Sequence, residues 1–109
     1  MNYVKVAQTT DLAPGEKKKV MVGEKAVLLA NIDGEYYAID NSCPHMGGSL
    51  VDGALEGSNI ICPRHGSIFD VKTGKAVHGG KLLFINFNVA DTVHYPVIVE
   101  GSDIKIEIV

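Results

Sequence analysis

The chain of 109 residues has no tryptophan, two cysteines and four prolines, and it lacks any long apolar run. Two cysteines are too few for the disulfide framework of a small secreted domain. No apolar run approaches the ~20 residues that cross a bilayer, and no charged start followed by an apolar core marks a secretory signal. The net charge is −3 and the one basic run, at residues 17–19, is short, which argues against nucleic acid or an anionic membrane as partner. We therefore expect a soluble, cytoplasmic protein.

Apolar residues mostly alternate with polar ones, a pattern that indicates strands rather than helices. The stretch AVLLANIDGEYYAI, residues 26–39, predicts a hairpin that bends at Asp33 and Gly34. Pro96 should place its strand at a sheet edge or a bulge. Neither a repeat nor a linker interrupts the chain, so we predict one all-β domain over residues 1–109, an antiparallel β-sandwich or small barrel. Its other strands are expected near residues 3–6, 20–22, 59–62, 67–71, 83–89, 93–99 and 104–108.

Two short segments carry side chains that bind metals: CPHMGG at residues 43–48 and CPRHGSIFD at residues 62–70. Each opens with Cys-Pro and places a histidine two or three residues after the cysteine. Buried cysteines that happen to adjoin surface histidines would require a coincidence in both segments. A Cys43–Cys62 disulfide would leave both histidines without a role. A Cys2His2 zinc site has suitable ligands, but zinc sites usually take both cysteines from one loop and both histidines from the other.

An iron–sulfur site accounts for the pairing of one cysteine with one histidine in each segment. Cys43 and Cys62 would hold one iron, His45 and His65 the other, and two sulfides would bridge them. In the type, order and spacing of these residues the sequence closely resembles the Rieske iron–sulfur family. The resemblance implies a Rieske-type β fold, a cluster-binding subdomain built from loops near 41–50 and 62–70, and a [2Fe-2S] cluster as cofactor.

The resemblance also gives roles to residues beside the ligands. Gly47, Gly48 and Gly66 would let the backbone approach the cluster and aim N–H groups at its sulfurs, and the Ser67 hydroxyl would donate a further hydrogen bond. Phe69 stands where high-potential members of the family carry a tyrosine donor. The additional cysteines by which those members link the two loops are also missing, since positions 48 and 64 hold Gly and Arg. We therefore expect a reduction potential in the lower part of the Rieske range of about −150 to +300 mV.

By resemblance the protein is a one-electron carrier and not an enzyme, and the sequence offers no separate catalytic residues. Missing loop cysteines and the lack of a membrane anchor favour a soluble ferredoxin. Its expected donor is a ferredoxin reductase containing flavin, and its expected acceptor is a ring-hydroxylating-type oxygenase or another redox enzyme. Two alternatives stay open: a small Rieske-like subunit of a nitrite-reductase-type complex, and a redox-sensing interaction module.

One part of the chain departs from the family pattern. Residues 79–81 read Gly-Gly-Lys, where family ferredoxins usually carry a proline-containing third loop over the cluster. The apolar stretch at residues 82–89 is interpreted as an added or longer strand, with an exposed partner surface as the alternative. His78 and His94 are expected at the surface and outside the ligand set, which is already complete.

Overall fold

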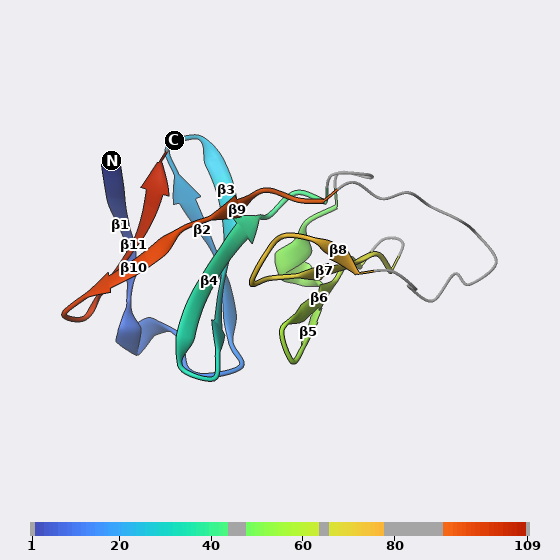
Figure 1. Ribbon diagram of the computed structural model, residues 1–109, viewed down its shortest axis with the longest axis horizontal. Coiled ribbons are helices and arrows are strands. Elements are labelled where there is room, and N and C mark those ends of the chain that lie inside the picture. The colour runs from blue at the N-terminus through green and yellow to red at the C-terminus, as the bar shows by residue number, and fades with distance from the viewer. Residues whose placement is uncertain (1, 44–47, 64–65, 78–90, 109) are drawn as a thin grey trace.

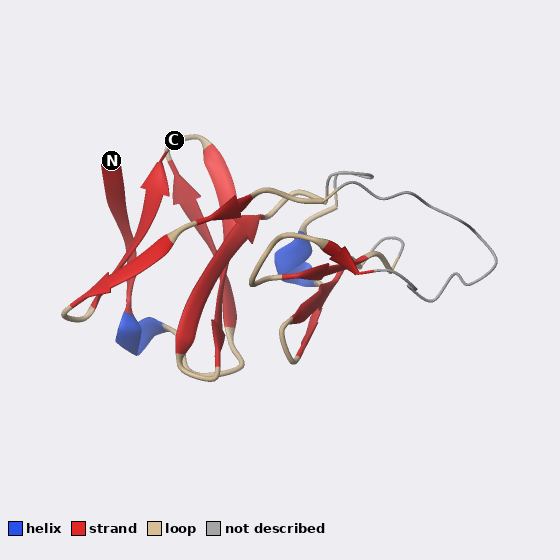
Figure 2. Ribbon diagram, viewed as in Figure 1, coloured by secondary structure: helices blue, strands red, loops and turns tan. Residues whose placement is uncertain are grey.

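The computed structural model describes residues 2–43, 48–63, 66–77 and 91–108. Strands make up most of these ranges, and two single-turn 3-10 helices, η1 (Thr9–Asp11) and η2 (Leu50–Asp52), are the helical elements within them (Figure 2). The strands form three antiparallel sheets (Figure 1). The predicted all-β, antiparallel fold is therefore confirmed.

The first sheet contains the hairpin that the sequence predicted. Asp33 has a φ of 54° and Gly34 a φ of 93°, which are the left-handed conformations that a two-residue hairpin turn requires. The flanking residues Ile32 and Glu35 pair across the turn. The sheet has the strand order β2-β3-β4-β9, with bounds β2 (Lys17–Val22), β3 (Lys25–Ile32), β4 (Glu35–Asp40) and β9 (His94–Tyr95).

A second sheet packs against the first to form a sandwich (Figure 1). Its strand order is β1-β11-β10, with bounds β1 (Asn2–Gln8), β11 (Asp103–Ile108) and β10 (Val97–Glu100). Buried apolar side chains from both sheets, together with Leu12 of the segment between β1 and β2, form one cluster. We call it the sandwich core: Ala7, Leu12, Val20, Val22, Val27, Leu29, Ala38, Ile104 and Ile106.

The single strand expected at residues 93–99 is wrong, because Pro96 divides it into two. β9 pairs with β4 in the first sheet, whereas β10 pairs with β11 in the second. Proline has no N–H for a strand ladder and favours such breaks. The expected edge position of this region is confirmed, since β10 is an outer strand of its sheet.

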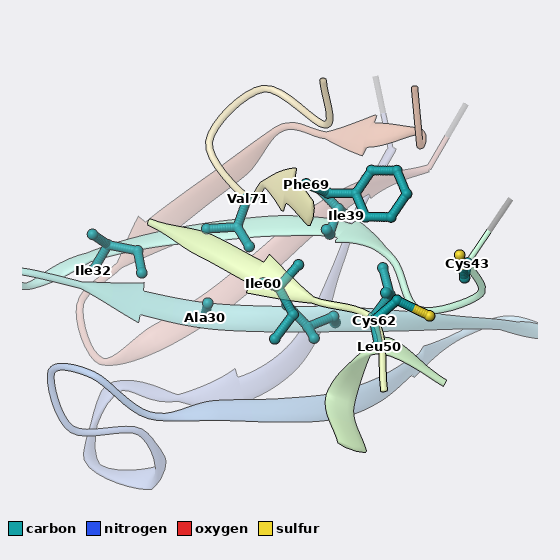
Figure 3. Packing of buried hydrophobic residues seen from close by; sticks show 10 residues of the cluster. Ala30, Ile32, Ile39, Cys43, Leu50, Ile60, Cys62, Phe69 and Val71 are labelled. Carbon is teal, nitrogen blue, oxygen red and sulfur yellow. The ribbon is translucent and has the colours of Figure 1, made fainter. Parts of the chain in front are cut away.

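A third, smaller sheet stands beside β4, on the side away from the second sheet (Figure 1). Its strands follow one another in the order β5 (Ala54–Glu56), β6 (Asn59–Ile61), β7 (Ile68–Asp70) and β8 (Ala76–Val77). It contributes to another group of buried side chains, which we call the loop-side core: Leu28, Ala30, Ile32, Ile39, Cys43, Leu50, Ile60, Cys62, Phe69 and Val71 (Figure 3).

Strand β3 lines both cores. Leu28 and Ala30 belong to the loop-side core, whereas Val27 and Leu29 belong to the sandwich core, and all four side chains are completely buried. A strand that is covered on both faces reads as a continuous apolar run rather than an alternating one. This double burial explains the run AVLLA in the sequence, and it ties the position of the small sheet to that of the sandwich.

Candidate metal centre

Cys43 and Cys62 lie in the segments that follow β4 and β6, and they belong to the same core. Cys62 directly follows β6, and Cys43 comes three residues after the end of β4 (positions 40 to 43). Their exposed fractions are 2% for Cys43 and 1% for Cys62, and both belong to the loop-side core. Figure 3 shows the two thiols at the same end of this core. The structure thus brings together the two cysteines of the sequence motifs.

The two loops are closed in the same way. The N–H of Cys43 donates to the carbonyl of Gly48 at 2.8 Å, and the N–H of Cys62 donates to the carbonyl of Ser67 at 2.7 Å. Each bond joins residues five positions apart (43 to 48 and 62 to 67). The loops therefore match in size, although the histidine follows the cysteine by two residues in one and by three in the other.

Gly66 and Gly48 occupy different kinds of position in these loops. Gly66 has a φ of +75°, a conformation that side-chain-bearing residues rarely adopt, and its N–H donates to the carbonyl of Cys62 at 3.0 Å. Gly48 is buried and supplies the carbonyl that closes the first loop. The N–H of Gly66 thus serves the loop itself here, and hydrogen bonds from these glycines to cluster sulfurs stay a prediction.

Of the remaining residues that the sequence predicted for the site, the structure describes some and leaves others outside its described ranges. Ser67 is half-buried, and its carbonyl closes the second loop. His94 is exposed on β9, which agrees with its expected surface position. Several positions of the sequence analysis lie outside the described residues: His45, Gly47, Arg64, His65, His78, residues 79–81 and the apolar stretch 82–89. Among the described ranges alone, no group of three metal-binding side chains is gathered.

Phe69 is a core residue as well as a neighbour of the candidate site. It lies in β7, pairs with Ile60 and Ala76, and is completely buried. In Figure 3 it lies at the end of the loop-side core that also holds the two thiols.

A hydroxyl added at this ring gives a direct test of the environment of Cys43 and Cys62. We expect Phe69→Tyr to raise the reduction potential of the expected iron–sulfur cluster. A hydrogen-bond donor to a cluster sulfur stabilises the added negative charge of the reduced state. Protein-film voltammetry measures this. An unchanged potential together with a loss of about 1–3 kcal/mol in unfolding free energy would show instead that the hydroxyl is buried without a partner.

Charge is sparse where the described parts of the loops meet. Positions 43, 48, 49, 62, 63 and 66–68 carry no ionisable side chain apart from the two thiols. Two tyrosines of the first sheet have a raised pKa. Burial and, to a smaller extent, Asp40 raise the pKa of Tyr95. The hydrogen bond to Glu35 raises the pKa of Tyr37. Both phenols therefore stay protonated at neutral pH.

The donor set fits an iron–sulfur cluster. Thiolates are the ligands that such clusters use, and the two thiols lie on matched loops at one end of an apolar core. Residues 45 and 65 lie within the same loops and would add one imidazole each. Burial of the two sulfur ligands also shields a cluster from water, and solvent exposure is one of the factors that set cluster potential.

Sequence reasoning missed one residue beside the site, Asn41. It lies two positions before Cys43 and is 5% exposed, and its side chain holds the segment at residues 49–51. The available signal was an asparagine at the end of an apolar strand, because asparagine side chains often bond nearby backbone at the start of a loop.

Comparison with known proteins agrees with this donor set. The family model described as Rieske [2Fe-2S] domain matches residues 2–82. The ferredoxin component of the naphthalene 1,2-dioxygenase/salicylate 5-hydroxylase systems of Ralstonia sp is 42% identical over 76 residues, which cover 70% of this chain and 73% of that protein.

Solved structures show the same fold. The ferredoxin of carbazole 1,9a-dioxygenase from Nocardioides aromaticivorans IC177 superposes with a TM-score of 0.84 at 30% identity and covers 97% of both chains. A chain from the complex of reduced oxygenase and oxidized ferredoxin in carbazole 1,9a-dioxygenase superposes with a TM-score of 0.81 at 26% identity, covering 95% of this chain and 91% of that one.

Proposed function

The chain belongs to the Rieske [2Fe-2S] domain family, and we propose that it holds the cluster through Cys43 and Cys62 on one iron and His45 and His65 on the other. The observation that supports this ligand set best is the pair of buried thiols on equally closed loops. The bound cluster supplies a site that accepts and releases one electron at a time. The protein is thus an electron carrier rather than a catalyst.

The protein residues around this site act by position and by exclusion of water. β6 leads directly to Cys62 and β4 ends three residues before Cys43, and the loop-side core beside them keeps solvent away from the sulfur ligands. We propose that Gly47, Gly48, Gly66 and Ser67 bring backbone and hydroxyl donors close to the sulfurs. We also propose that residues 1–109 form one Rieske domain, because β3 contributes to both cores.

We propose further that the electron passes to a ring-hydroxylating-type oxygenase. Relatives of this chain are ferredoxin components of dioxygenase systems, and a ferredoxin of similar fold has been solved in complex with its oxygenase. A flavin-containing reductase as the donor and a cytoplasmic location are parts of the same proposal. Within the part of the chain that the structure describes, no helix has the length and apolar character needed to cross a bilayer.

A reconstituted electron-transfer assay tests this function. The purified protein should be reduced by NADH and a ferredoxin reductase, and reoxidised when an aromatic-ring dioxygenase and its substrate are added, as followed by absorbance. The structure-matched control is Cys62→Ala, which should support no electron flow between the same two enzymes. Reduction without any reoxidation by a panel of oxygenases would contradict the proposed acceptor and favour a subunit or sensor function.

The histidine ligands can be tested separately from the partners. We expect His45→Ala to lose the EPR signal of the reduced cluster. His65→Cys should either lose this signal or lower the reduction potential toward that of plant-type all-cysteine clusters, at about −400 mV. The matched control is His94→Ala, because His94 is an exposed histidine on β9 outside both loops. Normal spectra in both loop variants would show that other residues hold the outer iron.

A further inference from the structure

The two ligand loops are equally closed but unequally supported. The second loop continues into the ladder between β6 and β7, where Ile61 pairs with Ile68 and Ile60 pairs with Phe69. At the base of the first loop, in contrast, the described residues form an isolated bridge between Ser42 and Ser49. The chain then enters the single turn of η2 rather than a strand. Something other than a ladder has to hold the returning segment of the first loop.

Asn41 supplies that support with four hydrogen bonds. Its backbone N–H donates to the carbonyl of Ala26 in β3 at 3.0 Å, and its carbonyl accepts from the N–H of Leu50 at 2.8 Å. Its side-chain Nδ2 donates to Oγ of Ser49 at 2.9 Å, and its Oδ1 accepts from the N–H of Val51 at 2.9 Å. The residue therefore connects the buried strand β3 to three consecutive residues that follow the first loop.

The amide side chain suits this position because it holds a donor nitrogen and an acceptor oxygen at the same distance from the backbone. Alanine would offer neither, and the Val51 N–H is one of the first N–H groups of η2, which have no partner inside the helix. This hydrogen bond is partly buried, so loss of its acceptor costs free energy, and a shift of the surrounding segment would relieve that cost. Movement at residues 49–51 would reach Gly48 directly, and Gly48 accepts the hydrogen bond that closes the loop at Cys43.

We propose that Asn41 is a positioning residue for the first cluster-binding loop. Its amide takes the place of a strand ladder and fixes the distance between Cys43 and the returning backbone at Gly48. It thereby controls how firmly the cluster is retained and how its sulfurs are surrounded. This inference rests on the proposed function, since it assumes that Cys43 is a cluster ligand.

Asn31 provides a matched control elsewhere in the same sheet. It is 2% exposed, its Nδ2 donates to the carbonyl of Leu12 at 2.9 Å, and its Oδ1 accepts from the N–H of Gly34 at 2.8 Å. Asn31 thus has the same residue type, burial and number of side-chain bonds as Asn41. It supports the hairpin turn between β3 and β4 and not a ligand loop.

The experiment compares Asn41→Ala with Asn31→Ala in the protein purified with its cluster. Both variants should lower the thermal midpoint to a similar extent, because each loses two hydrogen bonds made by a buried side chain. Iron release to an excess of chelator is then followed at a temperature where circular dichroism shows both variants folded. We expect release from Asn41→Ala to be about tenfold faster than from the parent protein, and release from Asn31→Ala to stay within about twofold. The reduced-state EPR lines should shift or broaden only in Asn41→Ala.

Equal release rates and identical spectra in the two variants would overturn the proposal and show that Asn41 only contributes stability. If Asn41→Ala does not fold, Ser49→Ala applies the same test, because it removes only the acceptor of the Nδ2 bond; release at the parental rate would refute the proposal. Iron and sulfide content of the parent protein and of Cys62→Ala test the ligand set independently. If the parent protein holds a full [2Fe-2S] cluster and Cys62→Ala holds none, the ligand set stands. Asn41→Ala behaving like Asn31→Ala would then refute the positioning role alone.

Discussion

Replacing Cys62 by alanine should abolish cluster binding, which is the largest effect we expect at the site. Cys62 is 1% exposed and follows β6 directly, so alanine there would remove a buried ligand at a position that the strand fixes. Without Cys62, the iron held by the two cysteines would keep only the thiolate of Cys43. Iron and acid-labile sulfide per chain should fall from the full [2Fe-2S] content to less than about a tenth of it. Metal analysis and the loss of the red-brown colour measure this.

A conservative change in the same strand serves as the control. Ile60 is completely buried in β6, two residues before Cys62, and Ile60→Val removes one methylene from the loop-side core. It should cost about 0.5–1.5 kcal/mol of unfolding free energy and leave iron and sulfide unchanged. Full iron content in Cys62→Ala, or stoichiometric zinc without sulfide in the parent protein, would refute the proposed ligands.

Gly53→Ala should produce the largest loss of stability. Gly53 lies between η2 and β5, and a Cβ added there would come within 1.8 Å of the carbonyl oxygen of Ile61 and within 2.9 Å of its carbonyl carbon. These are backbone atoms of β6, the strand that pairs with both β5 and β7 and precedes Cys62. Relief of the clash would require the small sheet to separate from η2. We expect a loss of at least about 3 kcal/mol, at the upper end for overpacking, measured by denaturant unfolding.

The control for this variant is another glycine of the same sheet. Gly57 has a φ of +61°, and a Cβ there would meet no atom within 4 Å, so Gly57→Ala adds only the strain of a left-handed backbone, about 1–2 kcal/mol. Gly53 has an ordinary φ of −84°, so Gly53→Ala adds the clash without the strain of a left-handed backbone. If the two variants lost the same stability, close packing at Gly53 could not be the reason for its identity.

Local patterns predicted those parts of the fold that depend on neighbouring residues. The Asp33–Gly34 turn follows from the backbone freedom of its two residues, and the structure confirms it. The expected strands at residues 59–62 and 67–71 overlap β6 and β7, which pair as predicted. β5 and β8 have three and two residues and were not expected from the sequence, so their existence depends on the strands beside them, β6 and β7.

The candidate site divides in the same way. Ligand types and spacing are properties of the sequence, so the two motifs are enough to predict Cys43 and Cys62 as ligands, and the family assignment is confirmed. The sequence signalled a loop-starting asparagine at position 41 but not its partners Ser49 and Val51, because these are set by how the chain returns after the loop. The strand expected at residues 83–89 lies outside the described residues and stays a prediction.

The position of β3 between two apolar layers has a consequence for how the molecule melts. Detachment of the small sheet would expose Leu28 and Ala30 to water on a strand whose opposite face still packs against the sandwich. Exposing the apolar surface of β3 to water on either face costs free energy. The small sheet and the sandwich should therefore unfold in one cooperative transition. A ligand that binds only the native loops then protects the whole chain by mass action. Newly made protein without its metal would therefore be the form most exposed to proteases.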